Sequence, residues 1–153
     1  MAAAIAIDAS VIVRYLTGDD KTQSAAATDL FRAAQSGRVK LVIPTSTVQE
    51  TVYVLERIYN LEAAAIAPKM ISLLALSNVH SPDASWLFEA LQFYRTKNCD
   101  FGDALLCAYA HVEGCGVATF DKGILKKFPE VAAYAPLDWL AGKAKPRSAE
   151  EQN

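Results

Sequence analysis

The stretch AAIAIDASVIVRYL, residues 3–16, decides the fold because it sets one carboxylate, Asp8, between two apolar segments. Before Asp8, isoleucine alternates with alanine, which predicts a short buried strand, and after it the apolar residues recur at helical spacing. An unpaired carboxylate inside a buried strand is costly, so we expect Asp8 at the turn from strand to helix. Ligands bind at this edge of open α/β sheets. The alternative is that Asp8 or Ser10 only caps the helix.

Strand and helix patterns alternate along the rest of the chain. Turn residues separate helical spacing at 23–35, 45–60, 61–76, 83–94 and 99–114 from apolar runs at 40–44, 77–82, 115–121 and 134–137. This alternation predicts an α/β fold, a three-layer α/β/α domain with a central, mainly parallel sheet of about five strands. We expect this domain to occupy residues 1–140. The tail, 141–153, has no apolar periodicity and is predicted to be disordered.

The composition excludes several classes of protein. With a net charge of -2 over 153 residues the chain is no polycation, so any contact with nucleic acid must come from local patches. The first residues lack the basic segment of a secretion signal, and no apolar run is long enough to span a membrane. Three cysteines without a CxxC pair suit a reducing compartment. We therefore expect a cytoplasmic protein with no membrane partner.

One spacing of metal-ligand residues has to be weighed. Cys107, His111 and Cys115 recur every four residues and would share one face of a helix, where three such groups can bind zinc. Against zinc, the glycine at 114 is expected to end that helix before Cys115, and cysteine is among the residues most often buried. Core packing is the preferred interpretation.

Glu50 is the first of three further acidic residues that the surrounding pattern does not need. It falls in the predicted helix 45–60, where it could complete a capping box with Thr47. Ser46 offers the same box with Gln49 one residue earlier, which would leave Glu50 free. At 100° per residue, Glu50 then points away from the apolar stripe of its helix.

Asp103 and Asp121 complete this set of acidic residues. Asp100 suffices to cap the helix that begins near it, yet Asp103 follows in the first turn of the same helix. Asp121 follows the apolar run GVATF, so it stands at the end of a predicted strand, as Asp8 does. An ordinary turn residue is the alternative for Asp121.

The four carboxylates would form a functional site if they lie close together. In a parallel sheet, the strand ends and the starts of the following helices open onto one edge, so Asp8, Glu50, Asp103 and Asp121 are expected there together. Such a cluster needs a cation, and oxygen donors select Mg²⁺ or Mn²⁺. A metal in a carboxylate pocket suits phosphodiester hydrolysis.

Four basic residues near these carboxylates are candidate contacts for the substrate backbone. Arg14 follows Asp8 in the first helix, and Lys122, Lys126 and Lys127 follow Asp121 closely. Binding of phosphates by such residues depends on salt concentration. The alternative is that they belong to an ordinary solvated face.

Four motifs together resemble one known family. The segments IDASVIVRYL (7–16), TSTVQETVYVL (45–55), CDFGDALLCAYA (99–110) and VATFDKGI (117–124), in this order, are similar to motifs of the PIN-domain ribonucleases, and most of all to the VapC-like toxins of type II toxin–antitoxin systems. The resemblance runs from residue 4 to about residue 140. Its most specific parts are Asp-Phe-x-Asp-Ala-Leu and the later Thr-Phe-Asp.

The resemblance also implies roles for particular residues. Asp8 and Asp103 would ligate the metal, and Glu50 and Asp121 would complete the acidic pocket. Thr119 would orient the last carboxylate or a water. Ser10 occupies a position where the family often carries a small polar residue.

The activity that the resemblance implies is specific. It is that of a Mg²⁺- or Mn²⁺-dependent endoribonuclease that leaves a 5′-phosphate and a 3′-hydroxyl, forms a homodimer and is held inactive by a cognate antitoxin protein. One position departs from the family, because many members carry a further acidic residue where this chain has Gly123.

A PIN-like module that binds RNA or protein without chemistry is the main alternative function. The same architecture also serves phosphoacceptor domains and phosphatases. A phosphatase of the haloacid dehalogenase type needs a second aspartate where this chain has Ser10, so that interpretation is weak. Retention of all four acidic residues favours a catalyst over a binding module.

Overall fold

The first half of the chain builds a three-stranded parallel sheet in the order β1-β2-β3. The structure, a computed structural model, describes residues 2–142, so nearly all of the predicted disordered tail lies outside the described residues. Two compact units divide the chain, Met1–Ala84 and Ser85–Asn153, and each is described by itself. The prediction of a single domain over residues 1–140 stays a prediction.

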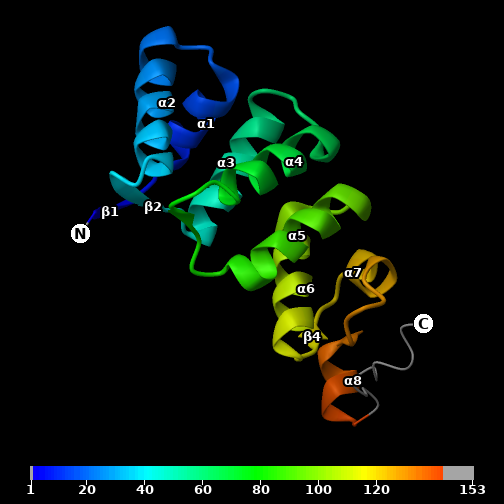
Figure 1. Cartoon of the computed structure of the whole chain (residues 1–153). Helices are drawn as coiled ribbons and strands as arrows, with labels where there is room; N and C mark the ends of the chain where they lie inside the picture. The colour runs from blue at the N-terminus through cyan, green and yellow to red at the C-terminus, as the bar shows by residue number, and fades with distance from the viewer. Residues whose placement is uncertain (1, 143–153) are drawn as a thin grey trace. The chain divides into compact units, whose positions relative to one another are not determined.

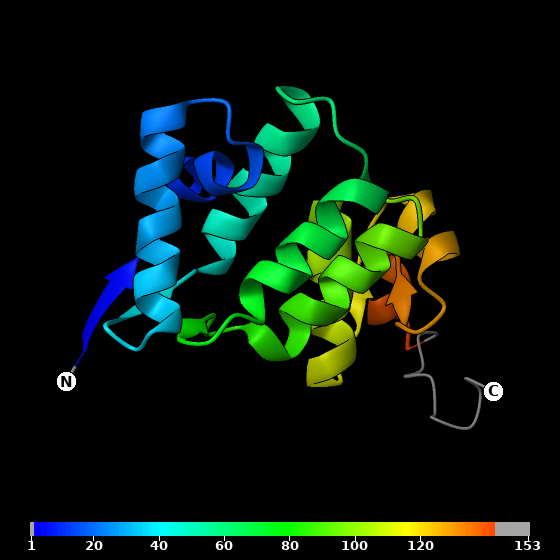
Figure 2. The same ribbon diagram turned by 45° about the horizontal axis from the view of Figure 1, so that its top comes forward.

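The first unit repeats a strand followed by two helices. Its elements in chain order are β1 (Ala3–Ala6), α1 (Ala9–Thr17), α2 (Lys21–Gln35), β2 (Val39–Val42), α3 (Thr45–Arg57), α4 (Ala63–Leu74) and β3 (Val79–His80). Ile5 pairs with Leu41 in the register of β1 and β2, and Leu41 pairs with Val79 in that of β2 and β3. Helix α1 packs against both α2 and α3 (Figures 1 and 2).

Local signals set the ends of these helices. Asp20 accepts a hydrogen bond from the Gln23 N–H and so caps the start of α2. Gly18 ends α1 in the left-handed conformation, with φ of 67°, which glycine adopts without strain. The predicted turn between the two helices is therefore confirmed. Buried side chains of α1, α2 and the following strand form the core, among them Ile12, Phe31 and Leu41.

The predicted burial of the first strand is wrong. The alanines of β1 are exposed and Ile5 is half-buried. Within the described residues β1 pairs only with β2, so it is an edge strand, and burial begins with Ile7 just after it. Alternation of isoleucine with alanine indicates a strand, but its burial depends on neighbours that are distant in sequence.

The second unit carries a smaller parallel sheet. Its elements are α5 (Ala84–Thr96), α6 (Phe101–Glu113), β4 (Val117–Ala118), α7 (Lys122–Lys127), β5 (Ala133–Tyr134) and α8 (Pro136–Leu140). Strands β4 and β5 pair in parallel, with Val117 opposite Ala133. The core includes Leu87, Leu91 and Phe128, all less than 2% exposed.

The fold is α/β with parallel strands, as predicted. The central sheet of about five strands is corrected in one respect: the strands form hydrogen-bonded sheets of three and two. Strands β3, β4 and β5 have two residues each. Among residues 2–142, no helix combines the length and the apolar character needed to cross a bilayer.

Candidate active site

Asp8 stands at the turn from β1 to α1, as predicted. It is the N-cap residue of α1, and its Oδ2 accepts bonds from the N–H and the hydroxyl of Ser10, at 2.9 and 2.5 Å. These two bonds lower the pKa of the Asp8 carboxyl, so the exposed side chain stays ionised. Asp8 therefore caps α1 through Oδ2 and stays exposed.

The start of α3 differs from both predicted capping boxes. The N-cap residue is Pro44, and no side chain caps the helix. The Thr47 hydroxyl instead donates to the Ile7 carbonyl oxygen at 3.0 Å. The boxes are wrong because the helix begins at Thr45 with Pro44 as its N-cap residue, so Ser46 and Thr47 lie inside its first turn. The bond ties the first turn of α3 to the residue just before Asp8.

Glu50 is exposed and takes no part in a helix cap. Its side chain is therefore free, as was expected if Glu50 did not complete a capping box with Thr47. Val48, Val52 and Leu55 form the buried face of α3, and Glu50 lies away from it. Asp8 and Glu50 line one pocket of about 320 Å³. Both carboxylates of the first unit thus open onto a common space.

A fixed guanidinium lines the same pocket. Arg14 Nε donates to Gln23 Oε1 at 2.8 Å, and Nη1 donates to Asp19 Oδ1 at 2.8 Å. The Tyr59 hydroxyl donates to the other Asp19 oxygen at 2.5 Å. Among the residues that the structure describes, none accepts a bond from Nη2 of Arg14. Arg14 is therefore held in place with one end of its donor fork available.

The lowered pKa of Asp19 leads us to expect that the folded state loses stability in acid. The Tyr59 and Thr17 hydroxyls and Arg14 hold the pKa of Asp19 at about 2, below its ordinary value of 3.8. A lowered pKa in the folded state contributes stability that is complete above the ordinary pKa and lost as the pH falls toward 2. We expect Asp19→Asn to flatten the fall in stability between these pH values, measured by urea unfolding at each pH.

Asp29→Asn is the matched control for this prediction. Asp29 lies on α2 and is 77% exposed, and its contact with Arg32 is long, at 3.8 Å. The control should follow the wild-type pH profile. An Asp19→Asn profile parallel to wild type would contradict the assigned role of Asp19.

The second acidic pair lies in the second unit. Asp100 is the N-cap residue of α6 but its side chain makes no cap bond, and Asp103 follows in the first turn. Asp103 is half-buried. Burial raises the pKa of its carboxyl, and the negative charges of Asp121 and Asp100 raise it further, against the opposing charge of Lys127. Asp103 and Asp121 are thus close enough to interact electrostatically.

Asp121 caps α7 at the end of the β4 segment. Its Oδ1 accepts bonds from the N–H groups of Gly123 and Ile124, at 2.7 and 3.3 Å. The Thr119 hydroxyl oxygen accepts from the Asp121 N–H at 2.9 Å, so Thr119 orients the backbone of Asp121 and not its carboxylate. Lys122 is the first residue of α7 and is exposed.

Gly123 lies close to the Asp121 carboxylate. A Cβ atom at this position would lie 2.9 Å from Asp121 Oδ1. We expect Gly123→Ala to turn the Asp121 carboxylate away from α7, with a cap loss of about 0.5–2 kcal/mol in the free energy of unfolding. If Asp121 is catalytic, the rate should fall about 10-fold or more. Urea unfolding and rate measurements on the same preparation check both. An unchanged rate together with the cap loss would remove Asp121 from the catalytic set.

The alternative zinc ligands do not share one site. Burial, with a contribution from the Asp103 charge, raises the pKa of Cys107 to about 12, so this thiol stays protonated. His111 Nδ1 lies 2.6 Å from Glu89 Oε1, and Cys115 is exposed beyond the end of α6. Within residues 2–142, no group of three or more His, Cys, Asp and Glu side chains is arranged to hold a metal ion. Core packing accounts for Cys107.

The comparison with protein families decides the family. A family model described as the PIN domain matches residues 5–132, which spans all four carboxylates. The chain belongs to the PIN domain family. PIN domains are typically metal-dependent nucleases. No curated protein matches the chain.

The acidic pairs of this PIN domain fit a divalent cation of the kind that the family uses. Each pair offers carboxylate oxygens, the donors that Mg²⁺ and Mn²⁺ prefer. Because Mg²⁺ usually takes one or two carboxylates and completes its shell with waters and substrate phosphate, two carboxylates suffice. Around Asp103 the accumulated negative charge is one that a cation would offset. Asp8 and Asp103 remain the predicted ligands.

Several residues that support the site were not identified from the sequence of this PIN domain. Asp19 was not singled out from the sequence, and Thr47 was considered only as a cap. Tyr59 meets Arg14 across 45 positions of the chain. The sequence offered one signal that could have identified such a supporting residue: a polar side chain inside an amphipathic helix, close to a predicted site. Of the three residues, only Thr47 has this signal.

Proposed function

We propose that the chain is a metal-dependent endoribonuclease in which Asp8, Glu50, Asp103 and Asp121 act together on the scissile phosphodiester. The observation that carries the proposal is membership of a typically nucleolytic family in a chain with a carboxylate at each of its four motif positions. Asp8 and Asp103 would ligate Mg²⁺ or Mn²⁺. A bound divalent cation lowers the pKa of water and neutralises charge that develops on the phosphate.

The chain's own residues would prepare this chemistry. Ser10 donates two hydrogen bonds to Asp8, which lower its pKa and keep it ionised. Thr119 fixes the backbone at Asp121. Arg14 and Lys122 would bind backbone phosphates of the RNA, since Arg14 is held in place at the pocket of Asp8 and Lys122 is exposed beside Asp121.

Cleavage of total RNA tests the proposal. The purified chain is incubated with Mg²⁺, with Mn²⁺ and with EDTA. We expect defined fragments with 5′-phosphate ends in the presence of a metal and none with EDTA, with activity restored when excess metal is added back. A folded protein that binds RNA but cleaves it under no metal would overturn the nuclease and favour a binding module.

We further propose that the nuclease is a cytoplasmic toxin that acts as a homodimer and is restrained by a cognate antitoxin protein. The support is the similarity of its four motifs to those of VapC-like toxins. Controlled expression in a bacterial host tests this part. Growth should stop with the wild type and continue with a variant that has lost one catalytic carboxylate. Unimpaired growth with active wild-type protein would leave a nuclease without a toxin role.

A further inference from the structure

Two lysines of the second unit form a reciprocal clamp. Lys97 Nζ donates to the Lys127 carbonyl oxygen at 3.0 Å, and Lys127 Nζ donates to the Asn98 carbonyl oxygen at 2.6 Å. Lys97 and Asn98 belong to the loop between α5 and α6, shortly before Asp103 in the first turn of α6. Lys127 is the last residue of α7, whose N-cap is Asp121. The clamp therefore joins the segment that leads to one acidic residue with the helix that begins at the other.

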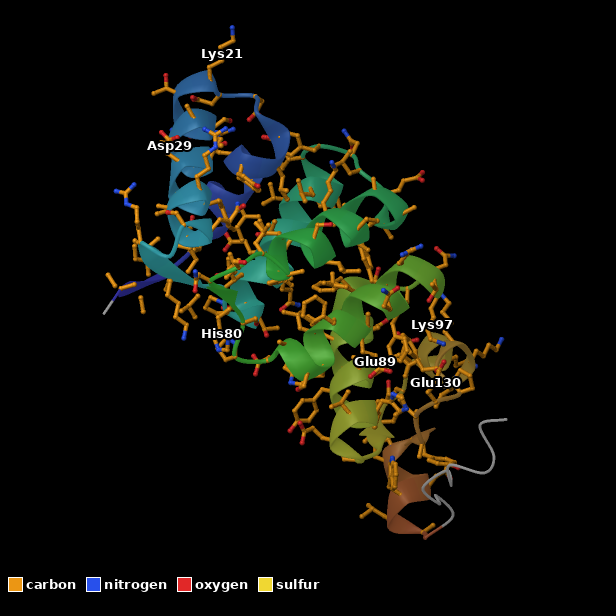
Figure 3. All side chains as sticks on the ribbon, in the orientation of Figure 1. Lys21, Asp29, His80, Glu89, Lys97 and Glu130 are labelled. Atoms are coloured by element: carbon orange, nitrogen blue, oxygen red, sulfur yellow. The ribbon has the colours of Figure 1, made fainter. Side chains whose placement is uncertain are left out.

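Lys97 is held on several sides, which fixes the clamp. Its ammonium group lies 2.7 Å from Glu130 Oε1, 5.1 Å from the centre of the Phe93 ring and 5.4 Å from that of Phe128. Figure 3 labels Lys97 and Glu130 in the second unit. The Lys97 side chain is only 15% exposed. A partly buried lysine with a carboxylate and two aromatic faces around it has little freedom, unlike the usual surface ion pair.

The loop that receives the clamp is also constrained. Asn98 adopts a left-handed backbone conformation, with φ of 48°, which is uncommon for a residue other than glycine. The next residue, Cys99, contacts the Phe93 carbonyl oxygen through its Sγ at 3.7 Å. The strained residue is thus the one whose carbonyl Lys127 holds, so the clamp helps to maintain the turn that leads into α6.

Helix α7 connects the clamp with Asp121. It has only six residues, each of which adds about 1.5 Å to its length, so the helix is short. A displacement of Lys127 at its end would therefore move the whole helix, including its start at Asp121. Lys127 also lies close enough for its charge to act on Asp103. A change at the clamp therefore reaches both members of the second acidic pair.

We propose that Lys97 and Lys127 are positioning residues that set the placement of Asp121 against Asp103, and through it the affinity of this acidic pair for a divalent cation. The inference rests on the proposed function, in which Asp103 is a metal ligand. It assigns no contact with substrate to either lysine. The charge of Lys127 acts on Asp103, and a positive charge there would by itself weaken the binding of a cation.

The sign of the effect on metal binding separates positioning from electrostatics. If the lysines only repel a nearby cation, neutral variants should bind Mn²⁺ more tightly. If they position the acidic pair, the same variants should bind Mn²⁺ more weakly, about 10-fold or more, as is usual when a residue that orients a metal ligand is lost. Mn²⁺ affinity is measured on the full-length chain by the electron paramagnetic resonance signal of free Mn²⁺, without any RNA.

Two variants remove the clamp. Lys127→Met keeps the length of the side chain and loses its donor. Loss of Lys97 alone would leave the Glu130 carboxylate without its partner, and among the described residues its buried Oε2 already has none. The double variant Lys97→Met/Glu130→Gln therefore removes both charges together. Glu89→Gln is the control: it removes the negative charge from the contact with His111 between α5 and α6 of the same unit and should leave Mn²⁺ affinity unchanged. Lys127→Arg retains a donor and should recover part of the affinity.

The outcomes distinguish the clamp from the proposed function. Weaker Mn²⁺ binding by both clamp variants, with normal circular dichroism and wild-type affinity in Glu89→Gln, supports the clamp. Equal or tighter binding by folded clamp variants overturns it and leaves the proposed function standing. A wild-type chain that binds no Mn²⁺ overturns the proposed function and the clamp with it.

Discussion

Asp103→Asn is expected to lower RNA cleavage about 10³-fold or more, equivalent to about 4 kcal/mol of transition-state stabilisation, without lowering the thermal stability of the chain. The carboxylate is half-buried, and the charges of Asp121 and Asp100 act on it. A neutral amide of the same size removes this repulsion, so the variant should unfold at the wild-type temperature or above it. Activity and stability should therefore change independently, which is typical of a functional and not a structural residue.

Asp100→Asn is the matched control for this prediction. Asp100 is a carboxylate on the same helix, three residues earlier, and it occupies the N-cap position without a side-chain cap bond. Asparagine is as good an N-cap residue as aspartate. The control should cleave at nearly the wild-type rate. Rates of the two variants with saturating Mn²⁺ and again with Mg²⁺, and their melting temperatures without added metal, check the prediction. Equal losses in both variants would indicate a general effect of charge on RNA binding, and an active Asp103→Asn would remove Asp103 from the catalytic set.

The sequence predicted those parts of the molecule that depend on neighbours along the chain. Asp8 was expected at a strand-to-helix turn, and it lies there because a carboxylate can cap the helix from that position. Gly114 was expected to end α6, and it does so with φ of 69°. Glu50 was expected away from the apolar stripe of its helix, and that stripe is buried while Glu50 is exposed. Helical periodicity and end signals carry this information within a few residues.

The incorrect predictions all concern partners that are distant in sequence. Thr47 was considered as a helix cap, but α3 begins earlier, at Thr45, and the Thr47 hydroxyl donates to the carbonyl oxygen of Ile7, forty residues away. The alternation in β1 indicated a strand correctly, but its exposure follows from its place at the sheet edge. Nothing in the local pattern distinguishes an edge strand from a central one when its side chains are small.

The same limit explains why the site could be predicted only in outline. Each carboxylate was identified from its own turn, whereas the residues that fix Arg14 come from two other segments of the first unit, at 19–23 and at Tyr59. Likewise, Lys97 and Lys127 meet across 30 positions. Side chains that orient a functional group leave little trace in a sequence, because any polar residue on an exposed helix face fits the same pattern.

Of the substitutions considered in the first unit, Phe31→Ala should cause the largest loss in the free energy of unfolding. Phe31 is fully buried on α2, and its ring lies 4.3 Å from that of Tyr15 on α1. Truncation of a buried phenylalanine removes about 3–5 kcal/mol from the free energy of unfolding, a large part of the roughly 5–15 kcal/mol of an ordinary domain. The melting temperature should fall by roughly 10 °C or more. Urea and thermal unfolding measure the loss.

This loss should act through the folded population and not through the chemistry. Because α1 carries Arg14 and is capped by Asp8, unpacking it from α2 would release both residues together. At a temperature low enough for Phe31→Ala to remain folded, its cleavage rate should approach that of wild type, whereas Asp103→Asn should stay inactive at every temperature. Phe31→Leu fills most of the space and should lose less stability. If the folded Phe31→Ala protein were inactive in the cold, the contact between α1 and α2 would set the geometry of the pocket itself, and Tyr15 would be the next residue to vary.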